Sequence, residues 1–250
     1  MSTVFLKDND PKPSVCEEQI IKKTQELEES NRELEAFCHA VSHDLRAPLR
    51  RARSYCQGVL ENLDNQDAET ARDYANRASL SMAHMNQLIN DLLRLSKTQS
   101  QVLRPSEFDI SLMVDDIAEQ LNYALEKPVE IKIQPDIWVV ADEGLIRIVL
   151  ENLLGNAWKY SKKADRPFVE FGASNFQGKT VFYVKDNGAG FNMHYAYKLF
   201  TPFQRLHSQK EFDGTGIGLA TVKRIVRRHF GRIWAESTVG KGATFYFTLD

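Results

Sequence analysis

The chain has 250 residues, of which 42% are hydrophobic and 26% are charged, and its formal net charge is -2 at pH 7. This length accommodates two domains of ordinary size. The near-neutral charge provides no global basic surface, so nucleic acid is not an expected partner. No apolar run approaches the roughly 18 residues of a membrane span, and residues 1–13 lack the features of a signal peptide.

The cysteine pattern bears on the cellular compartment. Cys16, Cys38 and Cys56 are widely spaced and form no CxxC pair. This pattern argues against a disulfide framework or a zinc site and indicates a reducing compartment. We therefore expect a cytoplasmic location, either for a whole protein or for the cytoplasmic part of a sensor whose input domain would lie upstream.

The first third of the chain has helical periodicity. Residues 1–16 are polar and contain two prolines, so a flexible lead-in is expected there. From residue 17 the sequence is rich in Glu, Gln, Lys, Leu and Arg, and apolar residues recur every seven positions as in a coiled-coil seam. This heptad series is Ile20, Leu27, Leu34 and Val41.

The stretch Asp64–Asp67 interrupts this pattern and predicts a turn, after which a second long helix is expected from about residue 68 to 100. Residues 17–101 are therefore expected to form a coiled-coil linker and a helical hairpin, whose second apolar stripe is spaced as on one helix face. The stripe comprises Met85, Leu88, Leu92 and Leu95. Because one hairpin cannot bury both stripes, we expect a homodimer that forms a four-helix bundle.

Residues 106–250 predict a second domain of α/β type. Asp142 is placed to cap a helix that runs to about Tyr160. The expected strands cover residues 107–110, 129–133, 137–140, 168–174, 180–185, 232–237 and 243–249, and the other expected helices cover residues 111–125 and 215–230. The fold class is thus multidomain α and α/β, a helical hairpin followed by a two-layer α/β sandwich. The segment around Ser100–Pro105 is the expected hinge.

The sequence around His43 has the pattern of a nucleophilic histidine. Val41, Leu45 and Leu49 mark the buried side of the helix, and His43 lies between them on the opposite side. Asp44 is suited to accept a proton from one ring nitrogen while the other attacks an electrophile. The alternative interpretation is a solvated helix histidine, which for an isolated surface histidine is the more common case.

Polar residues share one face of the helix expected at 142–160. Asn152, Asn156, Lys159 and Tyr160 follow the spacing i, i+4, i+7 and i+8, beside a separate apolar stripe. Amide oxygens suit Mg²⁺, which also keeps water and phosphate ligands, and Lys159 supplies a charge for phosphate. An ordinary polar helix face is the alternative explanation.

Three glycine-rich segments follow. Asp186-Asn187-Gly188-Ala189-Gly190 comes directly after a strand, where Asp186 is able to accept a hydrogen bond from the exocyclic amine of adenine. Gly214-Thr215-Gly216-Ile217-Gly218-Leu219 precedes a helix, so its N–H groups are suited to phosphate oxygens. Gly240-Lys241-Gly242-Ala243-Thr244 opens the last strand. A P-loop is absent, and a simple Asn-Gly turn remains an alternative for the first segment.

The long stretch between Phe191 and Asp213 is expected to form a mobile lid over the nucleotide. Its aromatic residues Phe200 and Phe203 are equally well explained as core anchors.

Taken together, these motifs resemble the histidine protein kinases of two-component signalling. His43 corresponds to the H box, Asn152–Tyr160 to the N box, Asp186–Gly190 and Gly214–Leu219 to the two glycine boxes, and Phe200–Phe203 to the F box. Their order and spacing match over residues 17–250. The residues around His43 and the run from Lys198 to His207 are most similar to kinases of phytochrome-type and PAS-type sensors.

This resemblance implies an ATP-dependent protein-histidine kinase with a Bergerat-type ATP-binding fold in residues 106–250. His43 would accept the γ-phosphoryl group, Asp44 would act as general base, and Asn156 would ligate Mg²⁺. The receiver domain of a response regulator would take the phosphoryl group on an Asp. The implied nucleotide-binding residues are Asn152, Asn156, Lys159, Tyr160, Asp186, Gly188, Gly190, Gly214, Thr215, Gly216, Gly218, Leu219 and Thr244.

One position departs from the family. Four residues after His43 the family often has Thr or Asn, which is associated with dephosphorylation of the partner, but this chain has Ala47. Because Ala cannot orient water by hydrogen bonding, weak phosphatase activity is expected.

Two other functional interpretations stay open, an ATPase of the same fold without a phosphohistidine and a non-catalytic dimerisation module. The sequence also leaves open whether ATP phosphorylates His43 of its own or of the partner subunit.

Overall fold

The computed structural model describes residues 23–24, 41, 44–100, 102–123, 128–207, 211–212 and 214–250, with only the backbone described for residues 96–100. The chain divides into residues 1–44 and residues 45–250, and nearly all described residues belong to the second unit. The predicted lead-in, most of the heptad series and His43 lie outside the described residues. No helix in the described part of the chain is long and apolar enough to cross a membrane.

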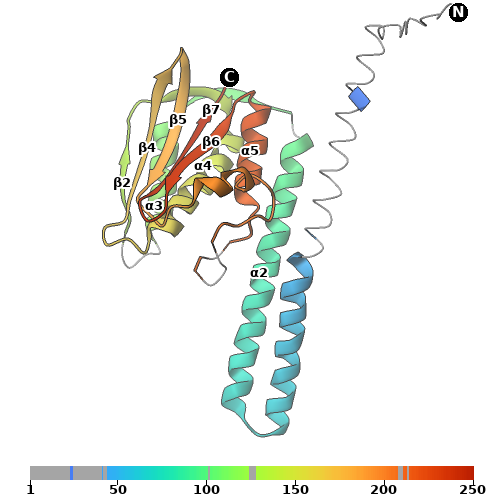
Figure 1. Ribbon diagram of the computed structural model, residues 1–250. Coiled ribbons are helices and arrows are strands. Elements are labelled where there is room, and N and C mark those ends of the chain that lie inside the picture. Colours follow the sequence, from blue (N-terminus) through green and yellow to red (C-terminus); the bar gives the residue numbers. More distant parts are fainter. Residues whose placement is uncertain are drawn as a thin grey trace, which may run out of the picture. The chain divides into compact units, whose positions relative to one another are not determined.

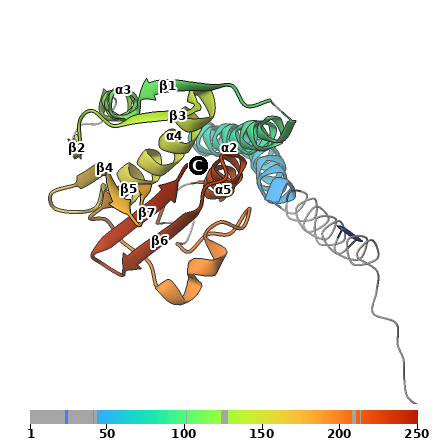
Figure 2. The ribbon, with the colours of Figure 1, turned by 90° about the horizontal axis from the view of Figure 1, so that it is seen from above.

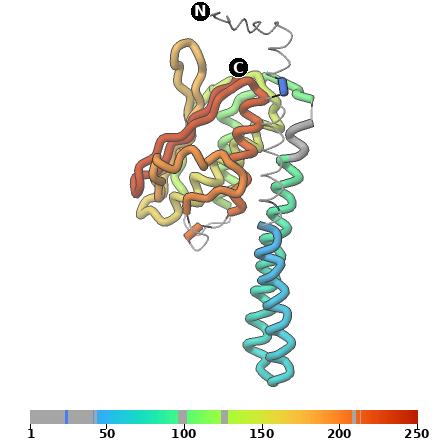
Figure 3. Tube along the Cα trace, turned by 45° about the vertical axis from the view of Figure 1, so that its right-hand side comes forward, coloured from blue at the N-terminus to red at the C-terminus, as the bar shows by residue number. Residues whose placement is uncertain are grey.

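A helical hairpin is formed by the helix at residues 44–64 and by α2 (Ala68–Ser100), which run side by side in Figures 1 and 3. The first helix continues through Pro48 without a break. Asp67 caps the N-terminus of α2, because its Oδ1 accepts a hydrogen bond from the backbone N–H of Thr70 at 3.0 Å. Gln66 before it has a left-handed φ of 59°. The predicted turn and second helix are thus confirmed.

The two helices approach each other closely through small residues and tyrosines. A side chain at Gly58 would lie 3.0 Å from the ring of Tyr74, and that ring also contacts Tyr55 at a centroid distance of 6.1 Å. Within α2, Leu88 and Leu95 of the predicted stripe are buried, whereas Leu49, expected on the buried side of the first helix, is 56% exposed. The single hairpin therefore leaves apolar surface uncovered.

The α/β domain contains a mixed sheet and three helices, in the order predicted. The elements are β1 (Pro105–Asp109), α3 (Ile110–Tyr123), β2 (Glu130–Ile133), β3 (Trp138–Asp142), α4 (Glu143–Ser161), β4 (Phe168–Phe176), β5 (Lys179–Asp186), the 3-10 helix η1 (Met193–Lys198), α5 (Gly218–Arg228), β6 (Ile233–Thr238) and β7 (Gly242–Thr248). No pattern in the sequence predicted η1. The predicted start of α5, at Thr215, was three residues too early.

The main sheet has the strand order β2-β4-β5-β7-β6, in which β2 and β4 are parallel and the other neighbours antiparallel. β1 pairs only with β3, in a separate two-stranded sheet. Figure 2 shows α3, α4 and α5 on one side of the main sheet. Apolar side chains from this side, such as Phe171 and Phe247, meet those of the helices in one core, so the two-layer prediction is confirmed.

A buried histidine joins α5 to the start of α4. His229, at the end of α5, donates from Nδ1 to the carbonyl of Ile225 at 2.9 Å and accepts at Nε2 from the backbone N–H of Asp142 at 3.1 Å. Asp142 in turn caps α4, since its Oδ1 accepts from the N–H of Leu145 at 3.1 Å. The two helices that carry the polar motifs therefore share one anchoring point.

Candidate nucleotide site

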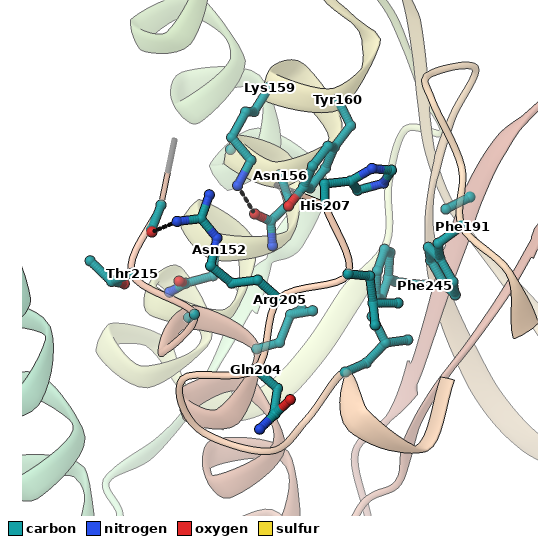
Figure 4. A pocket seen from close by; sticks show the side chains of 18 of the residues that line it. Asn152, Asn156, Lys159, Tyr160, Phe191, Gln204, Arg205, His207, Thr215 and Phe245 are labelled. Atoms are coloured by element: carbon teal, nitrogen blue, oxygen red, sulfur yellow. Dashed lines mark hydrogen bonds between the residues drawn. The ribbon is translucent and has the colours of Figure 1, made fainter. Parts of the chain in front are cut away.

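One pocket of about 390 Å³ brings together most of the residues that the sequence singled out (Figure 4). This volume lies in the range of ligand sites. Eleven of the thirteen predicted nucleotide-binding residues line it, and only Gly188 and Thr244 do not. The pocket lies beside α4, the ends of β5 and β7, the lid segment (residues 191–213) and the start of α5.

α4 presents the expected polar face to this pocket. Asn156 and Lys159 are joined by a hydrogen bond from Nζ to Oδ1 of 3.3 Å, and the same Nζ lies 4.3 Å from the ring centre of Tyr160. Asn152 donates from Nδ2 to the carbonyl of Ile148 at 2.7 Å, which sets the orientation of its amide. The face thus combines amide oxygens with one cation, as phosphate and a hard metal ion require.

Asp186 is the buried acid of the pocket, with 5% of its surface exposed. Desolvation raises its pKa to about 6, although hydrogen bonds from the N–H groups of Gly188 and Ala243 act in the opposite direction. Among the residues that the structure describes, both donors reach Oδ1, at 2.8 and 3.3 Å. Oδ2 is therefore the oxygen available to a ligand that donates a hydrogen bond.

The second glycine segment forms an irregular turn before α5. Gly214 and Gly216 have φ values of 148° and 74°, a region that favours glycine, and this explains why the helix starts at Gly218 rather than at Thr215. A side chain at Gly218 would lie 2.3 Å from Oδ1 of Asn152. The turn thus holds the N-terminus of α5 against the polar face of α4, and no side chain caps that N-terminus.

The two predicted residues that do not line the pocket have structural reasons for their positions. A side chain at Gly188 would lie 2.4 Å from the carbonyl oxygen of Tyr160, so this glycine allows the loop after β5 to pack on α4. Thr244 lies between Ala243 and Phe245, which do line the pocket. Because side chains alternate along a strand, Thr244 is on the opposite face of the sheet.

Several pocket residues were not assigned from the sequence. From the lid segment these include Gln204, Arg205 and His207, and from the hydrophobic core they include Phe191 and Phe245. The run from Gln204 to His207 was predicted to belong to the lid and was noted for its resemblance to the family, but no binding role was assigned to its residues. Alternation along the strand 243–249 would have indicated Phe245.

α2 also contributes to the wall of the pocket, through Gln87 and Asp91. Asp91 accepts a hydrogen bond of 2.7 Å at Oδ2 from the hydroxyl of Thr215. The sequence contains no signal for this contact, because it joins segments 124 residues apart.

The F-box phenylalanines do not line the pocket. Phe200 is partly buried against the core, which favours its interpretation as a core anchor. Phe203 has a left-handed φ of 64°, and its N–H donates to the carbonyl of Gly216 at 2.9 Å. It therefore supports the turn before α5.

Comparisons with known proteins agree with this geometry. Residues 33–101 match the model of the His Kinase A (phospho-acceptor) domain. Residues 141–250 match the model of the histidine kinase-, DNA gyrase B- and HSP90-like ATPase.

Curated relatives include cyanobacterial phytochrome B of Nostoc sp., 38% identical over 229 residues, which cover 90% of this chain and 30% of the relative. The sensor protein kinase WalK of Staphylococcus epidermidis is 30% identical over 236 residues, which cover 92% of this chain and 38% of the relative. The chain thus spans about a third of the length of such relatives.

Among solved structures, full-length ShkA in complex with AMPPNP is 28% identical, with a TM-score of 0.57 over 83% of this chain and 44% of that chain. The histidine kinase ThkA in complex with the response regulator protein TrrA is 21% identical, with a TM-score of 0.69 over 92% of this chain and 65% of that chain. The second likeness shows the shared fold. With a phospho-acceptor hairpin and an ATPase domain in this order, the chain belongs to the sensor histidine kinase family.

Proposed function

We propose that this chain is the kinase portion of a signalling protein, which uses ATP to phosphorylate His43 and passes the phosphoryl group to an Asp of a response-regulator receiver domain. The observation that carries the proposal is the pocket in which the buried carboxyl of Asp186 lies with the polar face of α4 and the start of α5. A sequence that also supplies His43, within the residues that match the phospho-acceptor domain, has the parts that a histidine kinase requires.

Adenine recognition is assigned to Asp186. Its Oδ2 accepts a hydrogen bond from the exocyclic amine, while the two backbone donors hold Oδ1 in place. Because a buried carboxyl discriminates strongly between ligands with and without a donor, this contact selects adenine over guanine, which has a carbonyl at the equivalent position.

The phosphates are assigned to the opposite end of the pocket. Lys159 supplies a positive charge, and the backbone N–H groups at the start of α5 supply donors with a favourable helix dipole. Arg205 lines the same pocket and adds a second cation. Together they offset the charge of a triphosphate.

Magnesium fits the oxygen-bearing residues of α4. Among the described residues no three His, Cys, Asp or Glu side chains form a metal cluster. We assign the amide oxygen of Asn156 as the protein ligand, with Asn152 close to the phosphates, because Mg²⁺ accepts an amide oxygen alongside phosphate and water. When bound, the ion neutralises charge on the phosphates.

The transfer itself requires little covalent chemistry from the α/β domain. An imidazole nitrogen of His43 forms a bond to the γ-phosphorus, the bond from that phosphorus to the bridging oxygen breaks, and ADP leaves. Asp44 takes the ring proton. In the second step a carboxylate oxygen of the receiver's Asp attacks the phosphorus, and the P–N bond to His43 breaks as the imidazole takes back a proton.

The proposed assembly is a homodimer. On α2, Met82, Ile89 and Leu93 follow the spacing i, i+7 and i+11 and are 49%, 42% and 53% exposed in the single chain. Such a stripe is typical of a helix that packs in a bundle, so the second hairpin would cover it. ThkA was solved together with a response regulator protein, and we extend that class of partner to this chain.

Weak phosphatase activity and a cytoplasmic location are parts of the same proposal. Ala47 lies on the helix of residues 44–64 and has no group that orients a hydrolytic water. Rapid loss of label from a phosphorylated cognate receiver on addition of this chain would contradict the first point.

The decisive experiment incubates the purified chain with γ-labelled ATP and Mg²⁺, beside the variants His43→Gln and His84→Gln. His84 lies on α2 and is a matched histidine outside the pocket. We expect acid-labile, base-stable label on the wild-type chain and on the His84 variant, and none on the His43 variant. ATP hydrolysis without label on any of the three would instead support an ATPase that forms no phosphohistidine.

A further inference from the structure

Two rings of the lid segment meet a ring of α4. Tyr160 ends the polar face of α4, and its ring lies 5.3 Å from that of His207 and 4.8 Å from that of Phe212. The rings of His207 and Phe212 are 5.3 Å apart, and Phe212 is only 4% exposed. We call Tyr160, His207 and Phe212 the ring cluster. Aromatic pairs at these distances contribute beyond their buried area.

His207 also makes a directed bond to the first glycine segment. Its Nε2 donates to the carbonyl of Gly190 at 2.9 Å. Gly190 packs closely against the neighbouring backbone, since its φ is 60° and a side chain there would lie 2.1 Å from the carbonyl oxygen of Thr238. In addition, the carbonyl of the preceding Ala189 accepts the N–H of Gly240 at 2.7 Å. His207 therefore attaches the lid to a rigid part of the sheet.

Arg205 makes a second connection at the same level. Its guanidinium donates to the carbonyl of Gly214 at 2.8 Å and to the carbonyl of Phe212. Arg205 thus joins the middle of the lid segment to Phe212 and Gly214, which follow it in the chain. Figure 4 shows Arg205, His207 and Tyr160 around the same pocket.

We infer that His207 is a positioning residue for nucleotide binding, an inference that rests on the proposed function of the pocket. His207 holds the Tyr160 ring and the Gly190 carbonyl at set positions, so the wall of the pocket is formed before the nucleotide arrives. It acts through these two neighbours. Since a preorganised site binds more tightly and lid opening often sets release, loss of His207 accelerates nucleotide dissociation.

The test uses the full chain and a fluorescent ADP derivative, with dissociation rates measured by stopped flow and with KM and kcat of autophosphorylation measured for ATP. For His207→Ala we expect dissociation about tenfold faster and KM about tenfold higher, since one hydrogen bond and two ring contacts are lost, while kcat changes less than about twofold. His207→Gln keeps an N–H donor and is expected to recover most of the affinity.

His194→Ala is the matched control, because His194 is an exposed histidine of η1 in the same lid segment and does not line the pocket. It is expected to release nucleotide at the wild-type rate. Wild-type release from His207→Ala, or a fall in kcat at unchanged KM, would overturn the inference. If His207→Ala does not fold, the variants His207→Gln and His207→Phe decide instead. Nucleotide release from His207→Gln as fast as from His207→Phe would overturn the inference.

The readouts separate this inference from the proposed function. A wild-type chain that binds the ADP derivative but forms no phosphohistidine contradicts the kinase proposal, and the release rates of the His207 variants still decide the role of His207. A wild-type chain that binds no adenine nucleotide contradicts both.

Discussion

The α/β domain buries many of its large apolar side chains in one core, although others such as Phe230 are exposed, whereas in the hairpin many of them lie on the surface. Phe171, Phe247 and Ile146 are completely buried in the domain. In the hairpin, Leu60 and Leu80 are 65% and 71% exposed, and several of the buried residues are alanines. The difference teaches that the domain forms a core within one chain, whereas the hairpin keeps apolar surface that the second chain proposed above would cover.

The largest expected effect comes from a cavity in the core of the domain. Phe171→Ala removes a completely buried ring from β4 and should lower the free energy of unfolding by about 3–5 kcal/mol. Thermal unfolding with nucleotide present and absent measures this. The hairpin dimer should persist, as judged by light scattering, and loss of both domain and dimer would show that the two regions do not fold separately.

A charge on the exposed stripe of the hairpin tests the other half of the comparison. Leu93→Glu places a carboxylate where Leu93, 53% exposed in the single chain, would pack against the partner. We expect the dimer to weaken by at least about 2 kcal/mol, from lost apolar burial and the cost of a buried charge. Sedimentation gives the dimer dissociation constant, and nucleotide affinity serves as the control that should not change. An unaltered dimer constant would place the interface elsewhere.

The pH dependence of nucleotide affinity follows from Asp186 and concerns the domain alone. Its pKa in the free protein is raised to about 6, so the carboxyl gains a proton as the pH falls through that value. Because the amine of adenine needs the ionised acceptor, affinity should decrease below pH 6 by up to about tenfold per pH unit. Titration calorimetry at pH 5 to 8 checks this. Asp186→Asn should bind more weakly and lose this part of the dependence, and an equal slope in both proteins would contradict the assignment.

The same carboxyl affects stability with the opposite sign. Its pKa is higher in the folded than in the unfolded chain, so the folded state holds the proton more tightly. Without nucleotide, the domain should therefore lose stability as the pH rises from about 4 to 6, and this loss should be absent in Asp186→Asn.

The smallest effect is expected at the hairpin turn. Asp67→Ala removes the cap from the N–H of Thr70 and should cost about 1 kcal/mol of hairpin stability. Chemical denaturation followed by circular dichroism measures this at fixed protein concentration, because the dimer equilibrium contributes to the result. Asp64→Ala at the other end of the turn is the control, and an equal loss there would point to charge rather than capping.

Much of the fold was predictable because local rules and packing agree in this chain. Asp142 is a helix cap in both sequence and structure, and the turn at Asp64–Asp67 was located from polarity alone. The start of α5 was misplaced because the Gly214–Gly218 run has a conformation that glycines allow but that their presence alone does not predict. η1 is a short 3-10 helix without amphipathic periodicity, and such elements have little local signal.

The site was predictable to the extent that its residues lie within contiguous motifs. The polar face of α4 follows from helical spacing, and Asp186 follows from its position at a strand end. Thr244 was predicted to bind nucleotide, but its neighbour Phe245 lines the pocket instead. A motif indicates the position along a strand but not the face on which a side chain lies. His207 and Asp91 reach the pocket through contacts between distant segments, which one sequence does not reveal.

The hydrogen bonds of His229 have a practical consequence for its chemical reactivity. With Nδ1 donating to Ile225 and Nε2 accepting from Asp142, both ring nitrogens are engaged in hydrogen bonds. His229 is thus closed to electrophiles such as diethyl pyrocarbonate as long as α4 and α5 keep their places. In native protein it should stay unmodified, and its reaction would serve as an internal reporter that the domain has opened.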